Sequence, residues 1–272
     1  MKDYTLKYGK GSVTFALDEA HVTELYGTPV PKIDDIRAAL YVTLSSPVSH
    51  EPLESWVNPE DKVALIVSDM SRFWMRQDLV VPHIISYLTD KCDVNQNNIT
   101  IIIANGTHPG GDENELRTLV TDGVYDRIRV VNHDCQAKDL VYIGTTSLGT
   151  EVRINPIAAN ADKVIMLGAC TYHVMAGYGG GRKSILPGIC SQETVNENHS
   201  YKAISSPYAN TGVLEHNPIH EDMLAAAKMV NVQFIFNVAL DGQKKIIAAW
   251  AGDLEKAHAE GVAFIRKWSQ GP

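Results

Sequence analysis

Short apolar runs recur along the chain, and a polar or glycine-rich turn follows each of them. These runs are rich in β-branched residues and too short for buried helices; they cover residues 62–68, 98–104, 128–131 and 163–167. A run that is apolar at every position is typical of a central strand in a parallel sheet, because helices cover both faces of such a sheet. The pattern therefore predicts four buried parallel strands.

Amphipathic segments lie between and after these runs. Helical spacing predicts helices over 38–44, 80–91, 113–121 (behind Asp112 as N-cap), 221–229 and 254–268. Apolar runs at 233–240 and 244–249 flank Asp241-Gly242, which predicts a tight hairpin. Strands that alternate with helices indicate an α/β fold. We expect a mostly parallel, Rossmann-like sheet with helices on both faces, followed by a C-terminal hairpin and helix.

The chain shows no repeat, low-complexity tract or linker that would divide it. We therefore expect one α/β domain over residues 1–272, with a less regular part over about residues 1–60. An apolar content of 44% excludes a disordered chain, since such chains lack the apolar surface needed to offset their ordering entropy. The net charge of −8 argues against a general nucleic-acid binder, which needs a basic stripe.

Targeting and redox signals are also missing from the sequence. No apolar run approaches the roughly 18 residues of a membrane-spanning helix, and the N-terminus has no apolar signal-peptide segment. Cys92, Cys135, Cys170 and Cys190 form no C-x-x-C pair. We expect reduced, buried thiols in a cytoplasmic protein that contacts neither membrane nor nucleic acid.

Polar and ionisable residues follow all four predicted strands, at 68–72, 105–108, 132–134 and 170–173. Ligands of open α/β sheets bind beyond the carboxyl ends of the strands. Any one of these segments by itself indicates a plain turn rather than a site, but their coincidence at four strand ends favours an active site. His108, His133 and His173 lie at these ends, and histidine is competent for acid–base chemistry near neutral pH.

A glycine-rich block, HVMAGYGGGRKS, covers residues 173–184. It nearly matches the phosphate-binding P-loop, but Arg182 stands where that loop needs glycine, which disfavours a nucleoside triphosphatase. No dinucleotide fingerprint is present either. Gly179, Gly180 and Gly181 would enter a helix opened by Lys183, and their N–H groups together with Arg182 and Lys183 could bind an anion. The alternative is a flexible glycine turn carrying two solvated cations.

The sequence gives no sign of a metal site built from protein ligands alone, since neither an H-E-x-x-H motif nor a cysteine pair occurs. His216 and His220 are four residues apart and could share a helix face. The intervening Asn217-Pro218 indicates a turn and a helix start instead, so we do not expect this pair to bind metal.

Several motifs together resemble the nickel-dependent lactate racemase family, in the order found in that family. The resemblance runs from about residue 60 to the end of the chain. The motifs are DMSR at 69–72, GTH at 106–108, NHD at 132–134, HVMAGYGGGRKSILPGI at 173–189, ENH at 197–199, NPIHEDM at 217–223 and AGD at 251–253. The glycine-arginine-lysine block is the specific element, whereas the short motifs would be weak by themselves.

The resemblance implies an N-terminal cofactor-binding domain that uses a nickel pincer nucleotide (pyridinium-3-thioamide-5-thiocarboxylic acid mononucleotide). It implies covalent attachment of this cofactor to Lys183, with His199 as a ligand of the nickel. It also implies that His108 and His173 are the acid–base catalysts and that Arg72 binds the substrate. The phosphate of the mononucleotide would suit the glycines at 179–181 or the loop near Asp69.

The implied activity is racemisation or epimerisation of a lactate-like 2-hydroxy acid by removal and return of a hydride. Members of the family carry a second, lid-like domain, so this chain is expected to be a shortened form or to work with a second chain. Residues 73–76 (FWMR) depart from the proline-bearing family pattern, which leaves the 2-hydroxy acid open. The alternative function is a nucleotide- or phosphate-binding module that is inactive without a partner chain.

Overall fold

The structure, a computed structural model, describes residues 1–24, 30–230 and 233–269. The chain forms two compact units, one of residues 1–29 with 266–272 and the other of residues 30–265. The smaller unit contains an antiparallel hairpin of strands β1 (Lys2–Tyr8) and β2 (Gly11–Leu17), followed by the short 3-10 helix η1 (Glu19–His21).

This hairpin corrects the expectation of irregular chain near the N-terminus. Apolar side chains alternate along both strands, and the pairs Tyr4–Phe15 and Leu6–Val13 lie opposite each other. Gly9 provides the positive φ of the turn, +56°. Alternation around a glycine turn is the usual signature of a hairpin. The sequence therefore carries the pattern of a hairpin here. All the strand residues except Tyr4 are exposed, so these strands do not form the unbroken apolar runs that identify buried strands.

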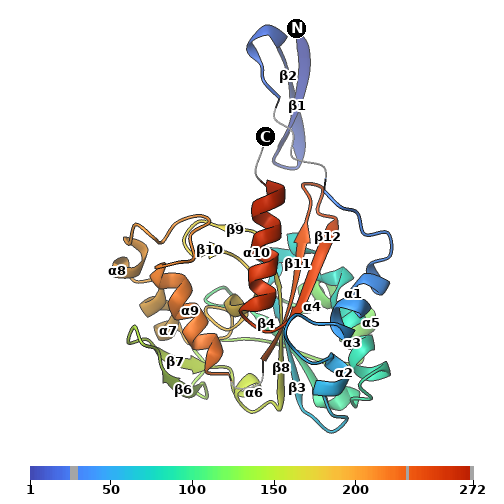
Figure 1. The fold of residues 1–272 in the computed structure, drawn as a ribbon, viewed down its shortest axis with the longest axis vertical. Helices are drawn as coiled ribbons and strands as arrows, with labels where there is room; N and C mark the ends of the chain where they lie inside the picture. Colours follow the sequence, from blue (N-terminus) through green and yellow to red (C-terminus); the bar gives the residue numbers. More distant parts are fainter. Residues whose placement is uncertain (25–29, 231–232, 270–272) are drawn as a thin grey trace. The chain divides into compact units, whose positions relative to one another are not determined.

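The larger unit contains a six-stranded sheet with the order β12-β11-β8-β3-β4-β5 (Figure 1). The strands from β11 to β5 are parallel, and β12 pairs with β11 in the antiparallel sense. Their bounds are β3 (Val63–Ser68), β4 (Ile99–Ala104), β5 (Arg129–Asn132), β8 (Lys163–Ala169), β11 (Gln233–Leu240) and β12 (Ile246–Gly252). The predicted parallel strands and C-terminal hairpin are confirmed.

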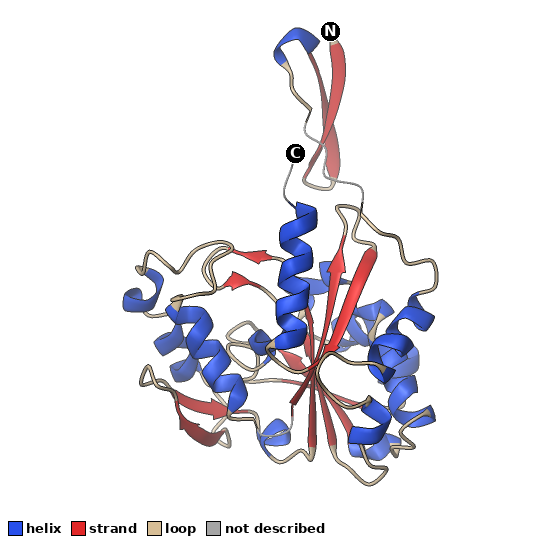
Figure 2. Cartoon of the chain, viewed as in Figure 1, coloured by secondary structure: helices blue, strands red, loops and turns tan. Residues whose placement is uncertain are grey.

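Helices cover both faces of this sheet (Figure 2). One face packs against α1 (Ile36–Ser45), α2 (Leu53–Trp56), α3 (Val81–Asp90), α4 (Glu113–Val120) and α5 (Asp122–Tyr125). The other packs against α6 (Pro156–Ala159), α7 (Gln192–Asn198), α9 (Pro218–Lys228) and the start of α10 (Lys256–Ser269), with α8 (Tyr201–Ile204) beside it. The α/β fold predicted from the alternation of strands and helices is confirmed.

The two layers explain why the strands are apolar at every position. Along β3, Leu65 and Val67 belong to one core cluster, whereas Ala64 and Ile66 belong to the other. Successive side chains of a strand point to opposite faces, so a strand buried on both sides needs an unbroken apolar run. A polar residue in such a run would leave a buried group without its hydrogen bonds.

The predicted cap of α4 is also confirmed. The side chain of Asp112 accepts the backbone N–H of Glu115 at 2.9 Å, and the Glu115 carboxylate accepts the N–H of Asp112 at 3.2 Å. This reciprocal pair satisfies two N–H groups that have no partner inside the helix.

The helix predicted to start at Lys183 is absent. The chain forms a single 3-10 turn, η5 (Gly181–Ser184), and then irregular turns up to residue 190. Pro187 has no N–H to donate and would interrupt a helix here. At Gly188 a Cβ would lie 2.3 Å from the carbonyl oxygen of Ser184, so the backbone folds back on itself. The regular helix, α7, begins only at Gln192.

Other short elements complete the larger unit. A second antiparallel hairpin, β6 (Val141–Thr145) and β7 (Glu151–Ile154), was not predicted, and β9 (Tyr172–His173) pairs with β10 (Gly177–Tyr178). The remaining 3-10 helices are η2 (Met70–Met75), η3 (Gln77–Leu79) and η4 (Gln96–Asn98).

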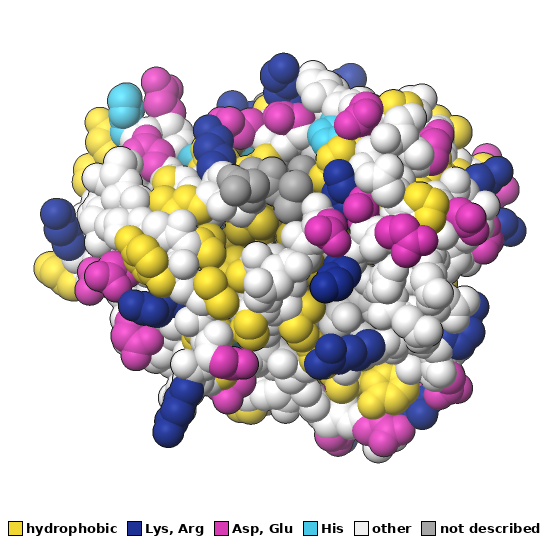
Figure 3. All heavy atoms as spheres, turned by 90° about the horizontal axis from the view of Figure 1, so that it is seen from below, with side chains coloured by type: hydrophobic (Ala, Val, Ile, Leu, Met, Phe, Trp, Pro, Cys, Tyr) yellow, Lys and Arg dark blue, Asp and Glu magenta, His cyan; other side chains and the backbone are white. Residues whose placement is uncertain are grey.

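The surface of the chain carries charges of both signs. On the face shown in Figure 3, lysine and arginine side chains alternate with aspartate and glutamate around smaller apolar areas. In the part of the chain that the structure describes, no helix is long and apolar enough to cross a membrane.

Candidate active site

The strand order places a crevice beside β3. The chain passes from β3 to β4 and β5 on one side and then returns to β8 on the other side. In open α/β sheets, ligands bind where the strand order reverses in this way. A cavity of about 410 Å³ lies at this point, lined by Ser68 after β3, by residues 104–108 after β4 and by Gly168 and Ala169 at the end of β8.

The loop that carries Lys183 is held by contacts between backbones. Gly168 lies so close to this loop that a Cβ would be 2.9 Å from the Cα of Gly180. A Cβ at Gly179 would be 2.9 Å from the carbonyl oxygen of Ala169. Gly180 has a φ of +92° and Gly181 a φ of +47°, which glycine adopts without strain. The glycines therefore allow Lys183 to sit directly on the end of β8.

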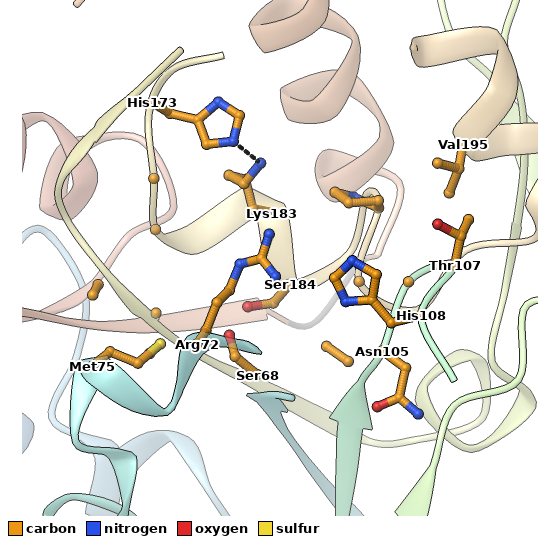
Figure 4. A pocket seen from close by; sticks show the side chains of 18 of the residues that line it. Ser68, Arg72, Met75, Asn105, Thr107, His108, His173, Lys183, Ser184 and Val195 are labelled. Carbon is orange, nitrogen blue, oxygen red and sulfur yellow. Dashed lines mark hydrogen bonds between the residues drawn. The ribbon is translucent and has the colours of Figure 1, made fainter. Parts of the chain in front are cut away.

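The side chain of Lys183 points into the cavity and meets His173 (Figure 4). The two nitrogens, Nζ and Nε2, are 3.2 Å apart. Burial, and after it the positive charges of Arg182 and Arg72, lower the pKa of Lys183 to about 7. The pKa of His173 is lowered to about 4 by burial first and then by Lys183 and Arg72. At neutral pH the imidazole of His173 is therefore largely uncharged, and the amine of Lys183 is uncharged in about half of the molecules.

Hydrogen bonds define the tautomer of His173. Its Nδ1 accepts the backbone N–H groups of Met175 at 3.3 Å and Ala176 at 3.1 Å. An Nδ1 that accepts carries no proton, so the proton of the neutral ring is on Nε2. Nε2 then donates to Nζ of Lys183, which can accept only as an uncharged amine. The geometry thus agrees with the lowered pKa of this lysine.

His108 faces the same cavity from the end of β4. Its Nδ1 is 2.6 Å from Oδ2 of Asp69, which is buried behind it. A carboxylate at this distance accepts the proton of Nδ1, so in the neutral ring Nε2 is the acceptor. Ser71 donates to the other oxygen of Asp69 at 2.7 Å, and Arg72 donates to Ser71 at 2.8 Å. Asp69 therefore orients His108 and is connected to the arginine of the site.

His199 lies at the C-cap of α7 and also lines the cavity. Its Nδ1 is 3.3 Å from the carbonyl oxygen of Val195, so the opposite nitrogen is free of that bond. The preceding residue, Asn198, is buried and donates to Asp222 at 3.0 Å. Thr146 and Thr150 donate to the same carboxylate at 2.5 and 2.9 Å. This network fixes the end of α7; its members are too far apart in the sequence for spacing to reveal it.

Arg182 does not point toward the cavity. Its side chain is 1% exposed and donates to the carbonyl oxygens of Ala176, Tyr178 and Gly180 and to Nδ1 of His220. The turn with two solvated cations is therefore excluded. The N–H of Gly181 donates to Oδ1 of Asn237 at 2.9 Å. Neither Arg182 nor Gly181 offers a donor to an anion in the cavity, whereas Gly179 and Gly180 line it.

His133, His216 and His220 do not line the cavity. His133 is buried with Nε2 2.9 Å from the carbonyl oxygen of Cys190, and burial lowers its pKa. It therefore joins two loops rather than lining the cavity. His220 bonds to Arg182, whereas His216 is exposed beside Glu215. Within the described ranges, no three His, Cys, Asp or Glu side chains are grouped in a way that could hold a metal ion.

The fold and these contacts define an α/β domain in which a buried amine and three imidazoles surround a crevice at the reversal of strand order. The chain belongs to the family described as the lactate racemase N-terminal domain, which it matches over residues 8–212.

Two relatives named lactate racemase are each 33% identical to this chain. The protein from Thermoanaerobacterium thermosaccharolyticum aligns over 274 residues, which is 97% of this chain and 62% of the relative. The protein from Lactiplantibacillus plantarum aligns over 272 residues, which is 98% of this chain and 63% of the relative. The chain therefore spans less than two thirds of the length of these relatives.

Solved structures agree with this assignment. The lactate racemase apoprotein from T. thermosaccharolyticum superposes with a TM-score of 0.88 and 31% identity, covering 99% of this chain and 63% of that one. A protein from Thermotoga maritima superposes with a TM-score of 0.71 over 88% of this chain and 61% of its own. At 17% identity the second match shows the fold alone.

Proposed function

We propose that this chain is the cofactor-carrying part of an enzyme that racemises or epimerises a lactate-like 2-hydroxy acid, with a nickel pincer nucleotide joined to Lys183. The observation that best supports this is the buried, uncharged amine of Lys183, placed in one cavity with His173, His108 and His199. Family membership points in the same direction.

The residues present fit the cofactor. An uncharged amine is the form that attacks an activated carboxyl or thiocarboxyl group, and Lys183 is held in that form by its contact with His173. His199 turns Nδ1 toward the carbonyl oxygen of Val195, so its Nε2 is available to a metal. A nickel ion here would draw its other ligands from the cofactor. When bound, the cofactor supplies a ring carbon that accepts a hydride and returns it.

The protein side chains would move the proton of the substrate hydroxyl. His108 presents an unprotonated Nε2 because Asp69 holds the proton on Nδ1, so it can accept this proton. His173 presents Nε2 from the other side of the site. Once the amine of Lys183 is used in a covalent bond, its lone pair no longer holds His173, and that ring is free to face the substrate. Two imidazoles from different strand ends suit a reaction that must serve both enantiomers.

Arg72 would bind the substrate carboxylate. Its guanidinium lies between Lys183 and His108 in the view of Figure 4 and is joined to Ser71 at 2.8 Å. A planar guanidinium binds a carboxylate through two parallel hydrogen bonds, which would fix the hydroxyl-bearing carbon between the two imidazoles.

The test is to co-express the chain with the enzymes that make the cofactor and to measure intact mass, nickel content and interconversion of D- and L-lactate. We expect a mass adduct on Lys183 and about one nickel per chain. The variant K183A should lose both, while K202A, at an exposed lysine of α8, should keep both. Absence of adduct and nickel from the unmodified chain would refute the proposal.

A second candidate is a nucleotide- or phosphate-binding module that turns over no substrate without a partner chain. It is favoured by the positive charge of Arg72 at the cavity, which Gly179 and Gly180 also line. Racemisation of lactate by the purified, cofactor-loaded chain alone would rule it out.

A further inference from the structure

Arg182 is a buried cation without a counter-ion. Its side chain is 1% exposed, and in the described parts of the chain no carboxylate lies within 4 Å of its guanidinium. Nε donates to Nδ1 of His220 at 2.8 Å, and Nη2 donates to the carbonyl oxygens of Ala176 at 3.0 Å and Tyr178 at 2.9 Å. A buried charge of this kind is expensive unless its hydrogen bonds are complete.

Two histidines complete these hydrogen bonds without changing the charge. Burial and Arg182 lower the pKa of both His220 and His258 to about 3, so both rings are neutral at physiological pH. Nε2 of His258 is 2.9 Å from Nη1 of Arg182 and 2.8 Å from the carbonyl oxygen of Gly179. In the neutral ring, Nε2 either accepts a hydrogen bond from Nη1 of Arg182 or donates one to the carbonyl oxygen of Gly179. In each case the full positive charge of Arg182 persists, whereas a carboxylate at either position would cancel it.

This charge lies directly behind the amine of the site, since Arg182 and Lys183 are neighbours in η5. Besides burial, the charges that lower the pKa of Lys183 are those of Arg182 and of Arg72 in η2. Lys183 in turn lowers the pKa of His173 in β9 and of His199 after α7. No carboxylate is among them, and Cys170, behind Arg182, is a buried thiol whose pKa is raised to about 12.

We propose that Arg182, His220 and His258 form a positioning group for Lys183, in which a guanidinium that is charged at neutral pH and has neutral partners shapes the glycine loop and keeps the neighbouring amine uncharged and nucleophilic. Three carbonyl oxygens of residues 176–180 converge on one guanidinium, so this loop is folded around Arg182 instead of around an apolar side chain. The lysine amine is further held as an acceptor by Nε2 of His173.

This inference deepens the proposed function, because it concerns the amine that we propose to carry the cofactor. Its test needs no cofactor, so the role of Arg182 and the proposed racemase function can be refuted independently of each other. Trace labelling of the chain with acetic anhydride over pH 5–11, followed by peptide mass spectrometry, gives the pH midpoint of acetylation at Lys183. For the unmodified chain we expect a midpoint near 7.

Two variants at His220 separate charge from shape. H220Q keeps a neutral acceptor for Nε of Arg182, and the midpoint should stay unchanged. H220E places a carboxylate there, and cancelling the charge behind the amine should raise the midpoint by about one pH unit. Equal midpoints for H220E and the unmodified chain, with both folded by circular dichroism, would overturn the proposal.

A second measurement covers the case in which H220E does not fold. R182A leaves a space of guanidinium size, and its labelling at Lys183 at pH 7 should fall about tenfold. Added guanidinium at millimolar concentration should restore it, while sodium chloride at equal ionic strength should not. Failure of guanidinium to restore labelling in folded R182A would also overturn the proposal.

Discussion

Replacing the lysine of the site should stabilise the protein. In K183M the buried amine becomes an apolar side chain of similar length. The pKa of Lys183 falls from its ordinary value of 10.5 to about 7 in the folded chain. When both folded and unfolded states carry the proton, that difference corresponds to a destabilisation of ~5 kcal/mol. Loss of the contact with His173 offsets about 1 kcal/mol. K183M should therefore be more stable by about 3–4 kcal/mol at pH 6.

The sign of the pH dependence follows from the lowered pKa. Below pH 7 both states are protonated and the full cost is present. Between pH 7 and 10.5 the unfolded state binds the proton and the folded state does not, so the stability of the unmodified chain rises with pH. The advantage of K183M should shrink to about 1 kcal/mol at pH 9, disappear near pH 10 and reverse by up to about 1 kcal/mol above pH 10.5, where only the lost contact with His173 remains.

Urea denaturation of the apoprotein at pH 6, 7.5 and 9, followed by circular dichroism, measures these differences. K202M, at an exposed lysine of α8, is the matched control and should change stability by less than about 0.5 kcal/mol at each pH. If K183M were less stable than the unmodified chain at pH 6, or if its advantage did not decline with pH, the assignment of an uncharged buried amine would be wrong.

Three further substitutions test the groups around the site. D222A removes a buried carboxylate that accepts three hydrogen bonds, so the free energy of unfolding measured in urea should fall by about 3–5 kcal/mol. D222N should lose less. A small and equal loss for both variants would contradict this hydrogen-bond network. D69N should move the proton of His108 from Nδ1 to a mixture of tautomers, visible in long-range ¹⁵N NMR spectra, and an unchanged spectrum would refute the orienting role of Asp69. D112A breaks the capping box of α4 and should cost about 1 kcal/mol, measured as a lower Tm; D112N should retain most of that stability.

Local patterns predicted most of the fold. The unbroken apolar runs of β3 and β8 identified the buried sheet, because strands covered on both faces have no polar side. The strand predicted to start at 244 begins at Ile246 as β12. Asp241 accepts the N–H groups of Gln243 and Lys245 and thereby closes a longer turn before it. The hairpin β1–β2 was not predicted, because its alternating side chains are exposed and form no unbroken apolar run.

Strand ends predicted where the site lies but not what each side chain does there. His108 and His133 follow neighbouring strands and look alike in the sequence, yet one faces the cavity and the other bonds to a loop carbonyl. Arg182 and Lys183 are adjacent in η5, yet they point in different directions because successive side chains of a 3-10 helix are about 120° apart. The partners of Arg182, such as His258, come from distant helices, so no local pattern could reveal them.

The direct contact of Gly168 with Gly180 has a consequence for how this site can change over evolution. Gly168 meets the backbone of the glycine loop directly, and the side chain beside this contact, that of Asn237, is held by the N–H of Gly181, so a compensating substitution has little room to act. Alanine at Gly168 would need a backbone shift, which would carry Lys183 away from His173. A saturation mutagenesis scan should therefore find these glycines as intolerant as the histidines, although they contribute no functional group. Sequence variation would be confined to the rim of the cavity, which can change its shape and charge while the amine stays in place.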